Sequence, residues 1–173
     1  MAGAESSVSL ATSSLLATVK SELIAYFRHL AQRVERHILA IPEERLWDKP
    51  FPFGNSLGHL ILHLTGNLNH YIGAGIAGTG YVRNRPLEFT DPNRYPREQL
   101  LQRFRETVDM VARTIEGMDE SALLKPVQFP DRHPIATQFG LLVVCASHMN
   151  NHIGQMAWLV QALGGRTGEP PVW

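Results

Sequence analysis

Two histidines four residues apart, His148 and His152, lie in the middle of an apolar helical pattern near the C-terminus. On an α-helix such residues share one face, within about 40° of each other, so both rings can reach one ion. Imidazole nitrogen is a common ligand of zinc and other late first-row metals. Alternatively, each ring is a core histidine bonded to a backbone carbonyl or an Asn side chain. A third ligand is needed to decide between these interpretations.

The candidate third ligand comes from an earlier helical pattern that carries His59, His63 and His70 on one side. The apolar stripe of this pattern centres near Leu64 and Leu68, and His63 lies closest to its edge, whereas His59 is turned further towards solvent. His70 lies about 10 Å along the axis from His63, too far for both rings to close comfortably on one ion unless the helix bends. We therefore predict His63 as the third ligand. Metal binding by His59 and His63 as an isolated surface pair is the alternative.

The remaining histidines and the single cysteine have structural interpretations. We expect His29 and His37 to flank the apolar face of the first helical pattern, and His133 to lie in a loop. Cys145 is expected to be a small buried core residue, with metal contact or oxidation as the alternative. A chain with one cysteine has no intrachain disulfide and no zinc site built from several of its own thiolates.

Four amphipathic helical patterns must position these residues. Pro42 ends the first pattern, Gly78 and Gly80 end the second, and Gly164 and Gly165 suit the end of the last. A possible short extended piece at 127–129 is the exception to the helical periodicity. The patterns span 9 or 14 to 40, 56–77, 96–117, and 135 or 137 to 163.

Four such helices predict an all-α protein, a four-helix bundle with long connections between the helices. Its 173 residues suit one domain, expected over 9–173, after a flexible tail at 1–8. Bundle cores are a usual place for metal sites built from side chains on facing helices. The long connections could cover one end of the bundle or shape a pocket.

The charge balance limits the classes of partner. Sixteen basic and sixteen acidic residues give a formal net charge of zero, without a dense Lys/Arg run, so we expect no nucleic-acid partner. The first residues lack the basic start and apolar run of a secretion signal. No segment approaches the roughly 20 apolar residues needed to span a bilayer. We expect a cytoplasmic protein without a membrane partner.

Several short segments together resemble the DinB/YfiT-like superfamily of bacterial proteins. They are Asn55-Ser56, His63 followed by Gly66-Asn67, the stretch from Arg83-Asn84-Arg85 to Glu88-Phe89, and His148-x-x-x-His152-x-Gly154-Gln155. The similarity covers about 47–165, and the first helical pattern matches only in its apolar spacing. This superfamily is unrelated to the DNA polymerase that shares the name DinB.

The resemblance implies a four-helix bundle, often a homodimer, that binds a divalent metal through one His of the second helix and two of the fourth. In this sequence these are His63, His148 and His152. Relatives include transferases and isomerases that use bacillithiol or mycothiol, and others are described as hydrolases. The resemblance therefore points to a metal-dependent enzyme that acts on a small-molecule substrate.

Three neutral imidazoles suit zinc or nickel and leave a coordination position open. Water there would become hydroxide, and a low-molecular-weight thiol there would become the nucleophilic thiolate. Neither His59-Leu-Ile-Leu-His63 nor His148-Met-Asn-Asn-His152 contains the Glu of an HExxH metalloprotease, although Glu88 or Asp91 could supply a carboxylate from a loop. We predict transfer or addition of a thiol cosubstrate to an electrophilic small molecule. The alternatives are a hydrolase that uses metal-bound hydroxide and a non-catalytic metal-binding dimer.

Residues one turn from the predicted ligands are candidates for the surrounding pocket. Asn67 and Gln155 could orient a ligand or contact substrate, or be ordinary helix-surface amides. Tyr71 could contribute a polar tip, or be a core aromatic. Arg83 and Arg85 could bind an anionic group, or pair at the surface with Glu88 or Asp91. A further set could line a helix–helix interface: Met156, Trp158 and Val160.

Overall fold

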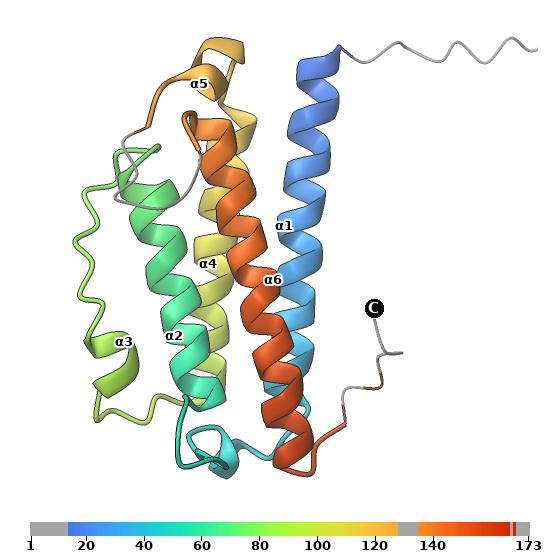
Figure 1. Ribbon diagram of the computed structural model, residues 1–173, viewed down its shortest axis with the longest axis vertical. Coiled ribbons are helices and arrows are strands. Elements are labelled where there is room, and N and C mark those ends of the chain that lie inside the picture. Colours follow the sequence, from blue (N-terminus) through green and yellow to red (C-terminus); the bar gives the residue numbers. More distant parts are fainter. Residues whose placement is uncertain (1–13, 128–134, 167, 169–173) are drawn as a thin grey trace, which may run out of the picture.

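The computed structural model describes residues 14–127, 135–166 and 168, and shows an all-helical bundle (Figure 1). No β-strand occurs in these residues, so the prediction of an all-α four-helix bundle is confirmed. The four long helices are α1 (Leu15–Leu39), α2 (Leu57–Leu68), α4 (Arg97–Glu116) and α6 (Gln138–Ala162). The shorter ones are the 3₁₀ turn η1 (Glu43–Arg45), the π-helical turn η2 (Asn69–Ala74), α3 (Leu87–Thr90) and α5 (Glu120–Leu124).

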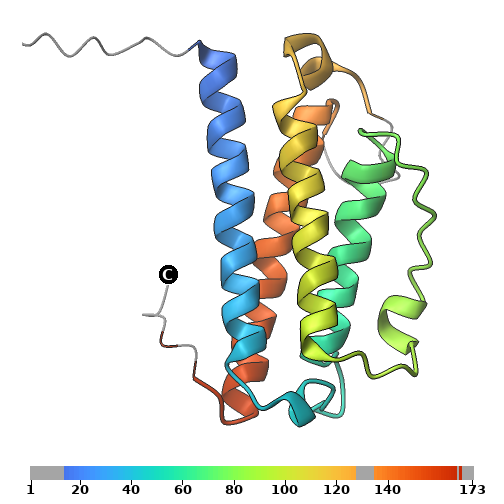
Figure 2. The same cartoon turned by 180° about the vertical axis from the view of Figure 1, so that it is seen from behind.

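Each long helix packs against two neighbours, in the cyclic order α1, α4, α2, α6. Helices α1 and α6 run in one direction, and α2 and α4 run in the other (Figure 1). Because α2 and α4 are parallel, the segment 75–96 between them must return along the length of the bundle. Figure 2 shows it descending on the outside of the bundle with α3 near its end. We call this segment the crossover.

Side-chain caps set the beginnings of three long helices. The hydroxyl of Ser14 accepts a hydrogen bond from the Ala17 amide, and the hydroxyl of Ser56 accepts one from the His59 amide, both at 3.2 Å. Thr137 caps α6 in the same way. Such caps satisfy amide groups that have no partner inside the helix. At the other end of α6, Gly164 has a φ of 73°, a conformation that favours glycine.

Two elements differ in detail from the predicted helices. The pattern expected to continue to 77 ends as an α-helix at Leu68 and continues as the π-turn η2 to Ala74. A π-turn changes the angular register of the residues after it, so periodicity alone does not reveal it. Of the predicted extended piece at 127–129, the structure describes Val127, whose amide bonds the Ala136 carbonyl at 3.0 Å beside an isolated bridge between Pro126 and Thr137. Residues 128 and 129 lie outside the described residues.

One apolar core, drawn from all four long helices, fills the bundle. Met156 and Val160 line its helix–helix interfaces, whereas Trp158 on the same helix is 71% exposed. That prediction is therefore confirmed for two of its three residues. Among the described helices, none is both long and apolar enough to cross a membrane.

Candidate metal centre

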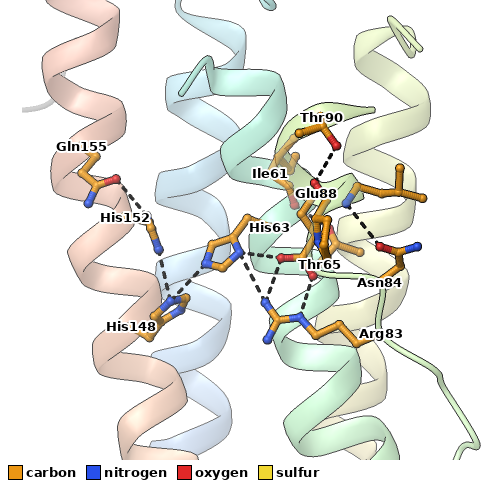
Figure 3. A network of polar contacts seen from close by, with 12 residues as sticks. Ile61, His63, Thr65, Arg83, Asn84, Glu88, Thr90, His148, His152 and Gln155 are labelled. Atoms are coloured by element: carbon orange, nitrogen blue, oxygen red, sulfur yellow. Dashed lines mark hydrogen bonds and ion pairs between the residues drawn. The ribbon is translucent and has the colours of Figure 1, made fainter. Parts of the chain in front are cut away.

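His63 of α2 faces His148 and His152 of α6, and the three rings meet between the two helices (Figure 3). The Nε2 atom of His148 lies 3.2 Å from the Nε2 atoms of both His63 and His152. One ligand atom from each ring falls within 4.8 Å of the others. The rings belong to antiparallel neighbours in the bundle, so α2–α6 packing brings together residues 85 and 4 positions apart.

The hydrogen bonds of the outer ring nitrogens show which nitrogens are free to bind a cation. Nδ1 of His63 lies 2.7 Å from Oε2 of Glu88, and Nδ1 of His152 lies 3.0 Å from Oε1 of Gln155. Both partners are acceptors, so each Nδ1 donates, and each neutral ring keeps a lone pair on Nε2. His148 could carry one proton on its Nε2, and that proton can bond only one of these two lone pairs. A cation would satisfy all three nitrogens.

The nitrogen spacing also fits a metal ion. Bonds of about 2.0–2.1 Å in a tetrahedral site place ligand nitrogens about 3.3 Å apart, and the two short Nε2–Nε2 distances are 3.2 Å. Three imidazoles suit zinc and other late first-row ions better than calcium or magnesium, which prefer oxygen. The residues present therefore fit a divalent transition metal.

Burial keeps two of the rings, those of His148 and His152, in the neutral form that a metal requires. Burial, assisted by the neighbouring His152, His63 and Arg83, lowers the pKa of His148 to about 3. Burial also lowers the pKa of His152, with His63 as a second cause. Near neutral pH both rings are uncharged, so no proton must leave His148 or His152 before an ion binds.

Glu88 anchors His63 from the crossover. Arg83 donates to both carboxylate oxygens of Glu88, from Nε to Oε1 at 2.6 Å and from Nη2 to Oε2 at 2.8 Å. Burial alone would raise the pKa of Glu88, but the hydrogen bonds from His63 and Arg83 hold it below its usual value. The ionised carboxylate thus fixes the His63 ring with Nε2 towards the other two histidines. Carboxylate–histidine pairs of this kind commonly orient metal ligands.

The fit of the crossover on α2 depends on a glycine. Gly66 lies three residues after His63 on α2. A Cβ atom at Gly66 would overlap the Glu88 carboxylate. The Phe89 ring also packs on the His63 ring, with centroids 4.8 Å apart. Gly66 therefore gives the crossover room to lie against α2 at the level of His63.

A cavity of about 420 Å³ opens beside the three histidines, and all four predicted pocket residues line it: Asn67, Tyr71, Arg85 and Gln155. Asn67 is buried, and its Oδ1 has no hydrogen-bond partner among the described residues. The guanidinium of Arg83 lies 5.8 Å from the centre of the Tyr71 ring. No Asp or Glu lines this cavity among the described residues. The complete lining is Asn55, His63, Asn67, Tyr71, Arg83, Arg85, Phe89, Val144, Cys145, His148, His152 and Gln155.

The solvent-facing position predicted for His59 is wrong. His59 is buried, its Nδ1 lies 2.6 Å from the Ser56 hydroxyl, and its ring packs edge-on against Trp47 at 5.3 Å. The connector between α1 and α2 folds back so that Trp47 covers this face of α2 beside Gly58. Burial lowers the pKa of His59, assisted by Lys49 and Arg94. The metal-pair alternative for His59 is thereby disfavoured.

The other structural predictions have mixed outcomes. His29 is exposed, but His37 is buried, with Nδ1 donating to the Arg33 carbonyl at 2.6 Å. Cys145 is buried as predicted, and burial raises the pKa of its thiol to about 12, although it also lines the histidine cavity. His70 does not join the three histidines. His133 lies outside the described residues.

Sequence reasoning missed the role of the Arg83–Glu88 pair. It offered Arg83 either as an anion-binding group or as a surface partner of Glu88 or Asp91. In the structure both side chains are more than nine-tenths buried, and Glu88 bonds a candidate ligand. The other proposed carboxylate, Asp91, accepts from the Tyr95 hydroxyl at 2.8 Å and does not line the histidine cavity. The available signal was the crossover's length, which requires it to run back along α2.

Comparisons with known proteins agree with this architecture. A search of the curated proteins found no match to the chain. The model of the DinB superfamily matches residues 23–156, which include most of α1, all of α2 and α4, and the three histidines. The chain therefore belongs to the DinB superfamily.

Proposed function

We propose that this protein is a metal-dependent enzyme that transfers or adds a low-molecular-weight thiol to an electrophilic small molecule. In this proposal His63, His148 and His152 bind a divalent ion, zinc or nickel. The observation that carries it is the convergence of three Nε2 atoms beside a cavity of about 420 Å³ with no carboxylate in its described lining. Cavities of this size suit a small organic ligand.

A divalent ion at this position would lower the pKa of a bound thiol and so favour the thiolate, the nucleophilic form. The thiol proton passes to solvent, and the sulfur forms a bond to the electrophilic carbon. In a transfer the leaving group departs with its bonding electrons; in an addition to a double bond, solvent returns a proton to the adjacent carbon. Glu88 holds the His63 ring in position throughout, through its 2.7 Å hydrogen bond.

The cavity walls offer groups that suit a polar thiol. Arg85 is exposed at the cavity, and its guanidinium lies over the Phe89 ring at 5.5 Å, where it could bind a carboxylate of the cosubstrate. The unpartnered Oδ1 of Asn67 could accept a hydrogen bond from an amide or hydroxyl. These groups support a hydrophilic cosubstrate rather than an entirely apolar one.

The carboxylates support thiol transfer over hydrolysis. A hydrolase commonly uses a free carboxylate or histidine to activate water. Glu88 is held by Arg83 and His63, and Asp91 is held by Tyr95 and Asn93 outside the cavity. A thiolate needs no further base once ionised.

The first experiment is metal analysis of protein purified without a histidine tag. We expect one zinc or nickel ion per chain in the wild type and in His29→Ala, whose histidine is exposed on α1. We expect less than a tenth of that occupancy in His63→Ala, His148→Ala and His152→Ala. Undiminished stoichiometric binding in all three variants would remove the site.

The second experiment separates the reactions. Metal-loaded protein is incubated with 1-chloro-2,4-dinitrobenzene and each of glutathione, cysteine, mycothiol and bacillithiol, and thiol loss is followed. We expect consumption with at least one thiol that is absent in His148→Ala and retained in His29→Ala. Hydrolysis of generic esters or amides without any thiol, together with no thiol loss, would instead support a hydrolase and contradict the proposal.

A further inference from the structure

An apolar groove lies beside the candidate metal centre, between the connector before α2 and the C-terminal half of α6. Its volume is about 420 Å³, and no charged residue is among its lining residues. We call it the aromatic groove; its lining residues are Phe51, Phe53, Gly54, Asn55, Leu60, Gln155, Trp158 and Leu159.

The groove exposes large aromatic side chains to solvent. Phe53 is 76% exposed and Trp158 is 71% exposed. The Phe51 and Phe53 rings stack with centroids 5.9 Å apart and planes at 14°. Phe51 and Phe53 lie on the connector and Trp158 lies on α6, so both sides of the groove offer an aromatic ring. Such a group of exposed rings is typical of a ligand site rather than of ordinary surface.

Two residues join this groove to the histidine cavity. Asn55 and Gln155 line both spaces, and Gln155 is the residue whose amide oxygen bonds His152. A molecule in the groove can therefore extend past Gln155 towards the three histidines. This continuity distinguishes the groove from a cavity of about 500 Å³ between the crossover, α2 and α4, which is lined by Glu88 but by none of the three histidines.

We propose that the aromatic groove binds the apolar, preferably aromatic, part of the electrophilic substrate, and that the reactive carbon then lies in the histidine cavity. This inference rests on the proposed function. It divides the site by polarity: the histidine cavity, with Arg85 and Asn67, receives the hydrophilic thiol, and the groove receives the uncharged acceptor. The groove therefore predicts an uncharged, apolar electrophilic substrate. The three histidines alone do not predict the polarity of this substrate.

Equilibrium binding tests the groove without requiring turnover. The probe is N-phenyl-1-naphthylamine, an uncharged aromatic molecule whose fluorescence rises when it leaves water. It is titrated into metal-free full-length protein, into Phe53→Ala and Trp158→Ala, and into Phe139→Ala, which removes an exposed aromatic ring elsewhere on α6. We expect saturable binding of one probe per chain, weakened about tenfold in each groove variant. Phe139→Ala should match the wild type.

Kinetics with two electrophiles test whether the groove serves the reaction. With metal-loaded protein and an active thiol, we expect the KM for 1-chloro-2,4-dinitrobenzene to rise about tenfold in Trp158→Ala. The KM for iodoacetamide, which is small and polar, should stay within about twofold of wild type, as should the metal content. A rise of both KM values together would show a general disturbance of the site and would contradict the inference.

The two sets of results distinguish failure of the inference from failure of the proposed function. Probe binding that depends on Phe53 and Trp158, without thiol consumption, would retain the groove as an aromatic ligand site and reject thiol transfer. If thiol transfer is observed, but the probe does not bind or binds equally well to both groove variants, the groove is rejected as the substrate site. Sedimentation velocity provides the remaining check: a wild-type dimer that both groove variants dissociate, and that binds no probe, would assign the groove to a second copy of the chain.

Discussion

At the residue scale, the histidines alone do not define the site, because each ring needs a partner to fix its tautomer. Glu88 supplies this partner for His63, and Gln155 supplies it for His152. The two partners differ in strength. A buried, ionised carboxylate held by Arg83 is a stronger acceptor than an exposed amide. His63 should therefore be the most rigidly oriented of the three rings.

We predict that Glu88→Gln weakens zinc binding about 10- to 100-fold, because a neutral amide replaces the carboxylate that orients His63 and raises its basicity. Competition titration with a chromophoric chelator measures the affinity, and circular dichroism confirms that the helices persist. Glu98→Gln is the control, since Glu98 is an exposed residue of α4 that pairs with Arg105. Equal affinity in Glu88→Gln and Glu98→Gln would show that the carboxylate has no influence on the ion.

We also predict that the metal-free protein loses stability as the pH falls from about 7.5 to 5. His148 has a pKa of about 3 in the fold against an ordinary value of 6.5, so in this range the unfolded chain takes up a proton that the folded chain does not. Stability from this residue is thus present above pH 6.5 and lost progressively below it. Urea denaturation in EDTA should show a smaller loss for His148→Gln than for the wild type, and an unchanged loss for His29→Gln.

At the element scale, the crossover determines the site as much as α2 and α6 do. It returns along the bundle because α2 and α4 are parallel, and this course places Arg83 and Glu88 beside His63. Gly66 gives it room to pack closely. A connection of this length would otherwise be free to vary, so its close packing on α2 is what makes it part of the site.

Two Gly→Ala substitutions separate this packing from helix propensity. In an open helical position the change stabilises by roughly 0.5–1 kcal/mol, and Gly154 on α6 has nothing near the place of a Cβ, so Gly154→Ala should gain this amount. At Gly66 the methyl group would displace the Glu88 carboxylate. We predict no gain in urea stability and a zinc affinity lowered about 10- to 100-fold, as in Glu88→Gln. An equal gain in urea stability in both variants would show that the crossover can move away from α2 without a loss of stability.

The sequence predicted the long helices well because their apolar spacing, prolines and caps are local signals. Helix faces singled out the three histidines as candidates, and the resemblance to the superfamily then selected them as one set, which the structure brings together. The sequence did not predict that Trp47 buries His59 or that Glu88 bonds His63, because both contacts depend on the path of a connection. Helical periodicity predicts the face of the helix on which a residue lies. It does not predict which connecting segment packs over that face, because the connections have no periodic pattern.

At the scale of the whole molecule, the three histidines link two of the four long helices near the middle of the bundle. A cation bound between their ring nitrogens would accept a lone pair from each ring. An ion that binds only the folded chain must then stabilise the whole bundle, because the unfolded chain does not bring His63 near His148.

We therefore predict a metal-dependent melting temperature. Free Zn²⁺ at 100 times its Kd should stabilise the fold by about 2.7 kcal/mol, a rise of about 5 to 11 °C for a chain of this size. Differential scanning calorimetry with buffered zinc measures it. His148→Ala should lose the rise and His29→Ala should keep it, while Mg²⁺ should have no effect because the site offers nitrogen rather than oxygen ligands. An equal rise in His148→Ala would place the bound zinc elsewhere on the chain.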